Sequence, residues 1–378
     1  MSTPEQASSP PRPLIEVASV FLRLGATAFG GPLAHLALMR EELVRRRGWV
    51  EERSFLDFLS LANLLPGPTS TEVAMLLGRA RAGSAGLFVA GTCFLLPSAL
   101  LVSALAALYQ RFGLLPDARW VLGSVQPVVV ALVATAVLPL ARATLRGLGA
   151  WALFAAALGM ALLGVHPLVV LLLAGLAGAG LRARPGETAM VLLPAGAVTV
   201  APVAVGLLPL FLVFLKIGAV VLGSGYVLLA FLQADLVDRL HWLTSAQLLD
   251  AVAVGQVTPG PVFTSATFVG WLLRGPAGAA VATLGVFLPA FLGAWVSGPL
   301  LAKVRASERA RGFLEGVNAG SLALMAQVTI LLGRATLVDL PSVVLCALGL
   351  VLLLWARING SWVVLGAALV GVVRALLA

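Results

Sequence analysis

Charge and cysteine are scarce in this sequence. Only 11% of its 378 residues are Asp, Glu, Lys or Arg, and its two cysteines, Cys93 and Cys346, lie far apart in apolar segments. A soluble domain of this size needs more surface charge, and two isolated cysteines supply neither a disulfide framework nor a metal site. The motifs G-x-x-x-x-G-K-[ST] and H-E-x-x-H are also missing. We therefore expect no ATP-driven chemistry, no metal, no cofactor and no enzyme activity.

Long apolar runs dominate what is present. Hydrophobic residues make up 60% of the chain, and runs such as Leu87 to Tyr109 and Trp151 to Leu181 reach or exceed the roughly 20 residues that cross a bilayer. The second run turns at His166-Pro167, so it predicts two helices. We expect an all-α protein that crosses the membrane many times. The net charge of +9 does not indicate nucleic-acid binding, because the arginines stand singly or at helix ends, where the positive-inside rule explains them.

The second half of the chain repeats the first. A shift of 193 residues, which becomes 192 after one deletion, places glycines, prolines, tryptophans and aspartates on residues of their own kind. Internal repeats of this size are typical of secondary transporters. We predict a disordered tail at 1–13, a transporter repeat at 14–185, a linker at 186–206 and a second repeat at 207–378. Matched residues include Trp49 and Trp242, Asp57 and Asp250, Gly78 and Gly270, and Pro97 and Pro289.

Lysine and arginine are distributed oppositely in matched loops of the two repeats. The loop at 40–53 is rich in arginine, whereas its counterpart at 233–247 holds only Arg239, and one loop later the second repeat has the excess. The positive-inside rule therefore predicts two repeats inserted upside down relative to each other. Within each repeat the two compared loops lie on opposite sides of the membrane, with one full helix and one broken segment between them. We therefore expect the broken segment to enter and leave on one side, as a re-entrant hairpin of two short helical legs. This predicts about ten full transmembrane helices plus two such hairpins.

Two tripeptides, Pro66-Gly67-Pro68 and Pro259-Gly260-Pro261, occupy equivalent places in the two repeats. Each stands in an apolar stretch, where proline removes a backbone donor and clashes with the preceding turn. We therefore expect the helix to break there. Backbone that is not helical survives at membrane depth only where protein covers it or where it lines a wet cavity. Equivalent breaks in two repeats indicate the binding site of a transporter.

Hydroxyl side chains open the leg that follows each break. A helix N-terminus with free N–H groups and hydroxyl donors favours an oxyanion, so we assign substrate binding to these residues and to both tripeptides. The alternative is that the hydroxyl groups only cap their own helices. The residues are Thr69, Ser70 and Thr71 in the first repeat, and Thr264 and Ser265 in the second.

Arg23 and Lys216 stand at the same position of the two repeats, in the middle of an apolar helix. A cation inside the membrane is costly and indicates function, and two such cations balance a dianionic substrate. The alternative is internal pairing with Asp57 and Asp250, which also match each other and which we consider as coupling residues. Glu72 has a serine as its counterpart, so it is either a proton relay without a symmetric partner or the counter-ion of Arg23.

Amides and glycines complete the predicted substrate site. Asn63 and Gln256 stand three residues before each tripeptide, and Asn318 stands on a later helix, where it matches Gln126. All three amides are placed to donate to the same ligand. His35 has no matching histidine, and we assign it to packing. Flexible backbone is expected at a second pair of glycine-rich breaks, which contain Gly30, Gly31, Gly223 and Gly225.

Short motifs follow one another in a definite order and spacing along both halves. The first half contains Phe29-Gly30-Gly31-Pro32, His35, Trp49, Pro66-Gly67-Pro68 and Gly78. The second contains Gly218 to Tyr226, Thr258 to Pro261, Phe287-Leu288-Pro289 and Gly316-Val317-Asn318. Together these motifs resemble the chromate ion transporter family. The resemblance covers most of 14–145 and 210–335, whereas the helices at 148–181 and 341–377 are generic.

The resemblance implies a long-chain, two-domain member of that family. Such a protein is expected to sit in the bacterial inner membrane, in contact with lipid, and to expel chromate from the cytoplasm by means of a proton or ion gradient. Sulfate and other tetrahedral oxyanions are alternative substrates. A passive anion channel, or a membrane module without transport activity, is the alternative from another class. A homodimer is left open, and no nucleic-acid partner is expected.

Overall fold

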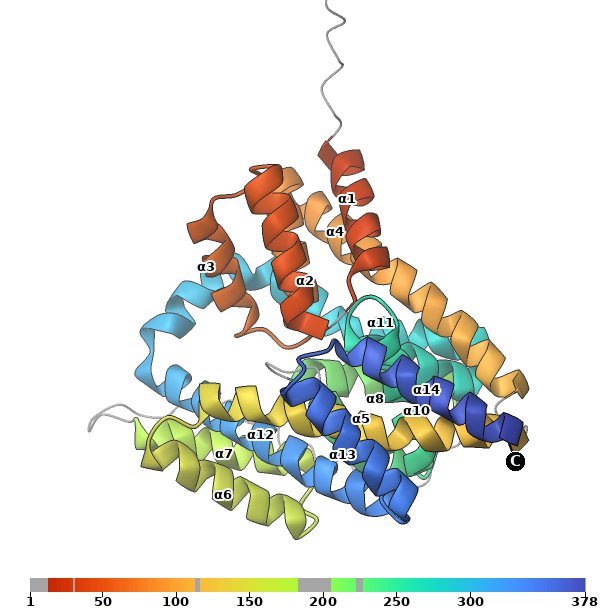
Figure 1. The fold of residues 1–378 in the computed structure, drawn as a ribbon. Coiled ribbons are helices and arrows are strands. Elements are labelled where there is room, and N and C mark those ends of the chain that lie inside the picture. The colour runs from red at the N-terminus through yellow and green to blue at the C-terminus, as the bar shows by residue number, and fades with distance from the viewer. Residues whose placement is uncertain (1–12, 30, 113–115, 183–204, 222–226, 378) are drawn as a thin grey trace, which may run out of the picture.

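The computed structural model describes residues 13–29, 31–112, 116–182, 205–221 and 227–377 (Figure 1). Within these ranges every regular element is helical, as predicted. The first half contains α1 (Pro13–Thr27), α2 (Gly31–Met39), η1 (Arg40–Arg46), α3 (Glu52–Ala62), α4 (Thr69–Phe112), α5 (Pro116–Thr144), α6 (Leu148–Leu162) and α7 (Pro167–Leu181). The second contains α8 (Leu207–Val220), α9 (Val227–Leu232), η2 (Gln233–Arg239), α10 (Ser245–Val257), η3 (Val262–Thr264), α11 (Ser265–Ala306), α12 (Glu308–Thr336), α13 (Leu340–Leu354) and α14 (Gly360–Leu377). Nearly all of the predicted tail and linker, together with Gly30, Gly223 and Gly225, lies outside the described residues.

Several of these helices have the length and composition of membrane spans. Four more described helices, α6, α7, α8 and α13, are apolar but have only 14 or 15 residues each. A 15-residue helix is about 22 Å long, which is less than the roughly 30 Å of the hydrocarbon core. The chain is a multi-pass membrane protein, and the total of ten crossings stays a prediction. The five described helices long and apolar enough to cross a membrane are Thr69–Phe112, Trp120–Arg142, Val262–Ser297, Glu308–Thr336 and Gly360–Leu377.

The helices of the two halves begin and end at positions that match under the shift seen in the sequence. α5 and α12 both contain 29 residues, and both α6 and α13 contain 15. A seven-residue π-helix stands in each half, as η1 and as η2. Apart from the short η3 before α11, the order of the elements is therefore the same in the two halves along the described chain.

A sharp turn divides α4 into a short leg and a long helix. Gly83 at the turn has φ +65° and ψ −156°, which is outside the helical region. A methyl group at Gly78 would lie only 2.4 Å from the Cβ atom of Ala90, although a straight helix would separate these residues by about 18 Å. The leg therefore folds back along the long helix. α11 makes the same turn at Gly275, with φ +61°.

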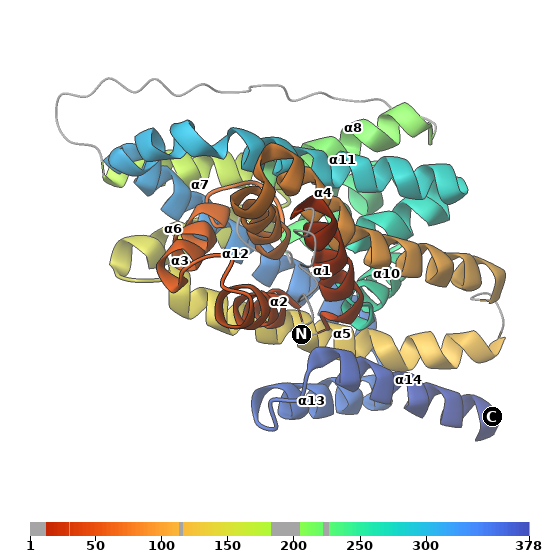
Figure 2. The same ribbon diagram turned by 90° about the horizontal axis from the view of Figure 1, so that it is seen from above.

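The last two helices of each half pack on the other half. α6 and α7 lie along α12, and α13 and α14 lie along α5 (Figure 1 and Figure 2). The two longest helices, α4 and α11, also pack against each other. The two halves therefore interlock, and the hydrophobic faces of one half are covered by helices of the other.

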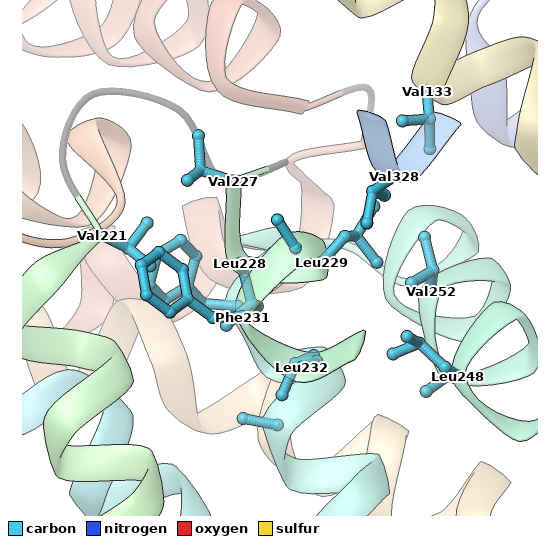
Figure 3. Close-up of a cluster of buried hydrophobic side chains, with 14 of the residues drawn as sticks. Val133, Val221, Val227, Leu228, Leu229, Phe231, Leu232, Leu248, Val252 and Val328 are labelled. Atoms are coloured by element: carbon cyan, nitrogen blue, oxygen red, sulfur yellow. The ribbon is translucent and has the colours of Figure 1, made fainter. Parts of the chain in front are cut away.

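The second half supplies much of the buried core. Every residue of α9 is buried, and α9 belongs to one hydrophobic cluster with Val252 of α10 and Val328 of α12 (Figure 3). The corresponding helix of the first half, α2, is only partly covered, and its Leu38 is 39% exposed. Helices at matching positions are therefore packed differently in the two halves.

Candidate functional site

Both tripeptides lie between helices and not inside one. The legs before them end at Ala62 and Val257, and helical structure resumes directly after the second proline of each tripeptide. Gly67 and Gly260 have φ values of +135° and +99°. Side chains of L-residues rarely tolerate this region, whereas glycine adopts it freely. The sequence folds this way locally because the flanking prolines cannot continue a helix.

Each break is held by the opposite half. The backbone N–H of Gly67 donates to the carbonyl oxygen of Val221 at 2.9 Å, and the N–H of Gly260 donates to the carbonyl oxygen of Ala28, also at 2.9 Å. Val221 directly follows α8, and Ala28 directly follows α1. The two hydrogen bonds match under the shift of 193 residues. We call residues 66–68 and 259–261 together the paired breaks.

A side chain does not fit at the centre of either break. A methyl group on Gly67 would lie 2.7 Å from the Cβ atom of Ala290 on α11 and 3.0 Å from a carboxyl oxygen of Glu72. A methyl group on Gly260 would lie 2.7 Å from the Cβ atom of Ser98 on α4. Close packing on the long helix of the other half and a positive φ therefore both require glycine here.

The amides of Thr71 and Thr264 are not free to receive an anion, which corrects our expectation. Their N–H groups donate to the carbonyl oxygens of Pro68 and Pro261, at 2.9 and 3.0 Å, because a turn after each proline brings that carbonyl within reach. The hydroxyl group of Thr264 is also occupied. It donates to the Pro261 carbonyl oxygen at 2.8 Å and accepts from the hydroxyl group of Ser98 at 3.1 Å.

Four side chains that flank the paired breaks keep buried polar atoms without a hydrogen-bond partner among the described residues. They are both carboxyl oxygens of Glu72, the hydroxyl groups of Thr71 and Ser265, and the amide nitrogen of Gln256. Such an atom costs about 1–3 kcal/mol when it stays unpaired, and most buried polar atoms in proteins have a partner. The two hydroxyl groups and the amide can donate hydrogen bonds to an oxyanion, and the carboxyl group can take up and release a proton.

His35 joins the first break to the end of α1. Its Nε2 atom lies 3.0 Å from the carbonyl oxygen of Ala28, and its Nδ1 atom lies 3.2 Å from the hydroxyl oxygen of Ser70. Because a carbonyl oxygen only accepts, Nε2 carries the proton and Nδ1 accepts from Ser70. The same Ala28 carbonyl also accepts from Gly260. His35 is buried, as packing requires, and it has these polar contacts in addition.

Lys216 pairs with Asp235, which differs from the expected alternative partner, Asp250. The Nζ atom of Lys216 lies 2.5 Å from one carboxyl oxygen of Asp235, and Arg239 lies 3.0 Å from the other. Asp235 is fully buried, whereas the Lys216 side chain is 28% exposed, so the carboxylate is shielded from water and the amine only partly. A signal for this partner was present in the sequence, because the shift of 193 residues places Asp235 on Glu42, another acid.

Arg23 lines a hollow of about 300 Å³. α1 forms one wall of the hollow, and the segment from α2 to η1 forms the other. The Arg23 side chain is exposed and has no hydrogen-bond or ion-pair partner among the described residues. Neither Asp57 nor Glu72 is therefore its counter-ion, and Arg23 and Lys216 are in different electrostatic situations.

The two matched aspartates are also placed differently. Asp250 is buried and accepts hydrogen bonds from the hydroxyl group of Tyr109 at 2.8 Å and from Gln126 at 2.9 Å. Asp57 is exposed on α3 and has no partner among the described residues. Asn318, the counterpart of Gln126, is exposed on α12. The sequence indicated neither Tyr109 nor this use of Gln126.

The remaining predicted residues have local roles. Asn63 is exposed and accepts a hydrogen bond from the hydroxyl group of Thr69 at 3.4 Å. Gly31 opens α2 with φ +79°, which is a turn that glycine permits. In the described part of the chain, no group of three or more His, Cys, Asp or Glu is placed to hold a metal ion.

Comparison with known proteins identifies the family. A family model described as "Chromate transporter" matches this chain twice, over residues 15–179 and 208–372. The chain is 32% identical to the "Chromate transport protein" of Cupriavidus metallidurans and 33% identical to that of Pseudomonas aeruginosa, in each case over 97% of this chain and 94% of the relative. It is 32% identical to the "Probable chromate transport protein" of Synechococcus elongatus over 89% of both chains. No solved structure matches. The chain belongs to the chromate transporter family, whose members are membrane transporters and not enzymes.

Proposed function

We propose that this protein is a secondary active transporter that exports chromate, or a related tetrahedral oxyanion, from the cytoplasm across the bacterial inner membrane. Family membership and the names of the relatives support chromate as the substrate. A proton or ion gradient drives the export. The units 14–185 and 207–378, joined by the linker at 186–206, are inserted in opposite orientations, and the legs beside each break enter and leave the membrane on one side.

The observation that carries this proposal is the reciprocal hold on the paired breaks. Because Gly67 is bonded to Val221, and Gly260 to Ala28, across the two halves, a movement of one half displaces both breaks together. The unpartnered donors flank these same breaks. A carrier needs a site that both halves share and that a ligand completes.

Each group beside the breaks has a defined role in this proposal. The hydroxyl groups of Thr71 and Ser265 and the amide of Gln256 donate to the oxyanion. Glu72 carries the coupled proton, because a fully buried carboxylate without a partner is far costlier than the neutral acid. Asp250 couples this site to α5, because it accepts from Gln126 there.

A passive channel for the same anions is the second candidate, and sulfate is the second substrate. The buried polar atoms beside the breaks would suit a channel as well, since they provide donors without requiring a gradient. The two functions differ in one respect, because a coupled carrier accumulates its anion against a concentration difference and a channel does not.

Uptake into liposomes tests the proposal. The purified protein is reconstituted, and uptake of labelled chromate and of labelled sulfate is measured with and without a pH gradient. We expect accumulation that depends on the gradient, its loss in Glu72→Gln, and its retention in Glu51→Gln, which changes an exposed glutamate. Uptake that only equilibrates would establish the channel. Accumulation that survives Glu72→Gln would show that Glu72 does not carry the coupled proton.

A further inference from the structure

Arg23 and Lys216 are counterparts, yet only Lys216 has a counter-ion. Lys216 lies 2.5 Å from Asp235, and Asp235 matches Glu42 in the first half. Glu42 is close enough to Arg23 for their charges to interact, but the two side chains make no hydrogen bond or ion pair in the described structure. The cation and the acid therefore form an ion pair in the second half, whereas the matching Arg23 and Glu42 of the first half do not.

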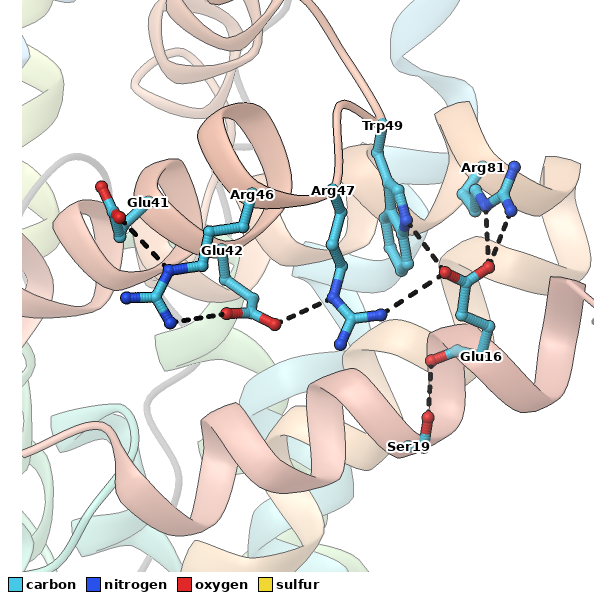
Figure 4. Close-up of polar contacts among 8 residues, drawn as sticks. All are labelled: Glu16, Ser19, Glu41, Glu42, Arg46, Arg47, Trp49 and Arg81. Carbon is cyan, nitrogen blue, oxygen red and sulfur yellow. Dashed lines mark hydrogen bonds and ion pairs between the residues drawn. The ribbon is translucent and has the colours of Figure 1, made fainter.

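Arg47 accounts for this difference. Its Nε atom donates to one carboxyl oxygen of Glu42 at 2.8 Å, while Arg46 lies 3.7 Å from the other (Figure 4). The hydrogen bond from Arg47 is the main cause that holds the pKa of Glu42 below its usual value. The residue that matches Arg47 in the second half is Leu240. Lys216 therefore shares Asp235 with Arg239 and His166, but not with a counterpart of Arg47.

The other acids at or near the hollow are engaged as well. Glu41 lies 3.3 Å from Arg46 and 3.5 Å from Arg45. Glu16 accepts from Arg81 at 2.7 Å (Figure 4). Neither acid that lines the hollow forms a hydrogen bond or an ion pair with Arg23 in the described structure. The hollow is lined by three arginines and two glutamates, so its ionisable side chains carry one net positive charge: Arg23, Arg46 and Arg47 against Glu41 and Glu42.

We propose that the hollow beside Arg23 binds a small tetrahedral oxyanion, with Arg23 as the binding cation and Arg47 as the positioning residue that keeps Glu42 away from it. The planar fork of a guanidinium group matches two oxygens of such an anion. The role of the hollow as a receiving site for the transported anion rests on the proposed function. We assign this site to the first half, because the matching cation of the second half, Lys216, is paired with Asp235.

Anion binding by the purified full-length protein in detergent tests the proposal, with inorganic chromate and inorganic sulfate as probes in titration calorimetry. Arg23→Gln is expected to weaken binding at one site by roughly tenfold or more, since a charge-assisted hydrogen bond is lost. Arg47→Leu is expected to weaken it as well, because Glu42 then turns to Arg23. Adding Glu42→Gln to Arg47→Leu is expected to restore binding, which a merely structural role of Arg47 does not predict.

A matched control is Arg45→Leu, which removes an exposed arginine of the same helix that does not line the hollow, and it is expected to leave binding unchanged. Wild-type binding in both Arg23→Gln and Arg47→Leu would overturn the proposal. So would anion binding that persists in phosphatidylcholine nanodiscs but disappears in phosphatidylglycerol nanodiscs, because a lipid headgroup would then be the natural occupant. Transport in liposomes tests the proposed function separately. Anion binding in the hollow and accumulation of chromate are independent measurements, so either can fail without the other.

Discussion

Gly67 donates its backbone N–H to the carbonyl oxygen of Val221 over 2.9 Å, and these residues belong to opposite halves of the chain. The matching hydrogen bond runs from Gly260 to Ala28. Each break is therefore completed by the end of a helix in the other half. A break of this kind is stable only when both halves are folded and docked, because a lone half leaves the amide without an acceptor.

The first prediction concerns the space at this glycine. Gly67→Ala is expected to destabilise the protein by about 1–3 kcal/mol, because the methyl group meets Ala290 at 2.7 Å and φ is +135°. Thermal unfolding in detergent measures the effect. Gly366→Ala is the control, since nothing lies within 4 Å of the added methyl group, and its helix is expected to be unchanged or slightly more stable. A Gly67→Ala variant as stable as the wild type would contradict the packing described here.

The second prediction compares the matched aspartates. Asp250→Ala removes the acceptor of both Tyr109 and Gln126, so we expect a loss of about 2 kcal/mol or more. Asp57→Ala removes no hydrogen bond of the described structure, and we expect a change within about 0.5 kcal/mol. Thermal unfolding of the two variants checks this difference, and equal destabilisation would show that the two positions are equivalent after all.

The third prediction concerns the buried ion cluster. Lys216→Met leaves Asp235 buried with Arg239 and His166 as its remaining partners, and we expect a loss of about 1–3 kcal/mol. Adding Asp235→Asn removes the buried charge and is expected to recover part of that loss. Chemical denaturation measures both variants. A double variant that is less stable than the single one would mean that Asp235 contributes through its other partners alone.

The fourth prediction concerns the inverted insertion of the two halves. Arg45→Cys and His241→Cys place single thiols at exposed positions of matched loops, in a chain whose own Cys93 and Cys346 are replaced by alanine. A membrane-impermeant thiol reagent is expected to label them from opposite sides of sealed vesicles, because the arginine excess of the two loops is opposite. Labelling of both thiols from the same side would contradict the inverted arrangement of the two halves.

The class of protein and the outline of its helices were readable in the sequence, because they depend on composition and on local chemistry. Apolar runs of membrane length predict helices in any context. Proline disfavours the continuation of a helix, and the turn at His166-Pro167 separates α6 from α7 as expected. Pro97 of α4 and Pro127 and Pro139 of α5 nevertheless stand inside helices. The positions of the paired breaks follow from the same rule, and the shift of 193 residues anticipated which helices match.

The partners of the polar side chains were decided only by the tertiary structure. Asp57 and Asp250 occupy the same place in the repeat, but only α10 brings its aspartate against Gln126 of α5. The sequence offered pairing of the cations with these aspartates as the alternative to substrate binding, whereas the folded chain pairs Lys216 with Asp235. The repeat in the sequence shows which residues occupy equivalent positions, but it does not show which of them come within the roughly 3–4 Å that a hydrogen bond or ion pair needs. Small differences in how matched helices dock therefore decide which residues meet.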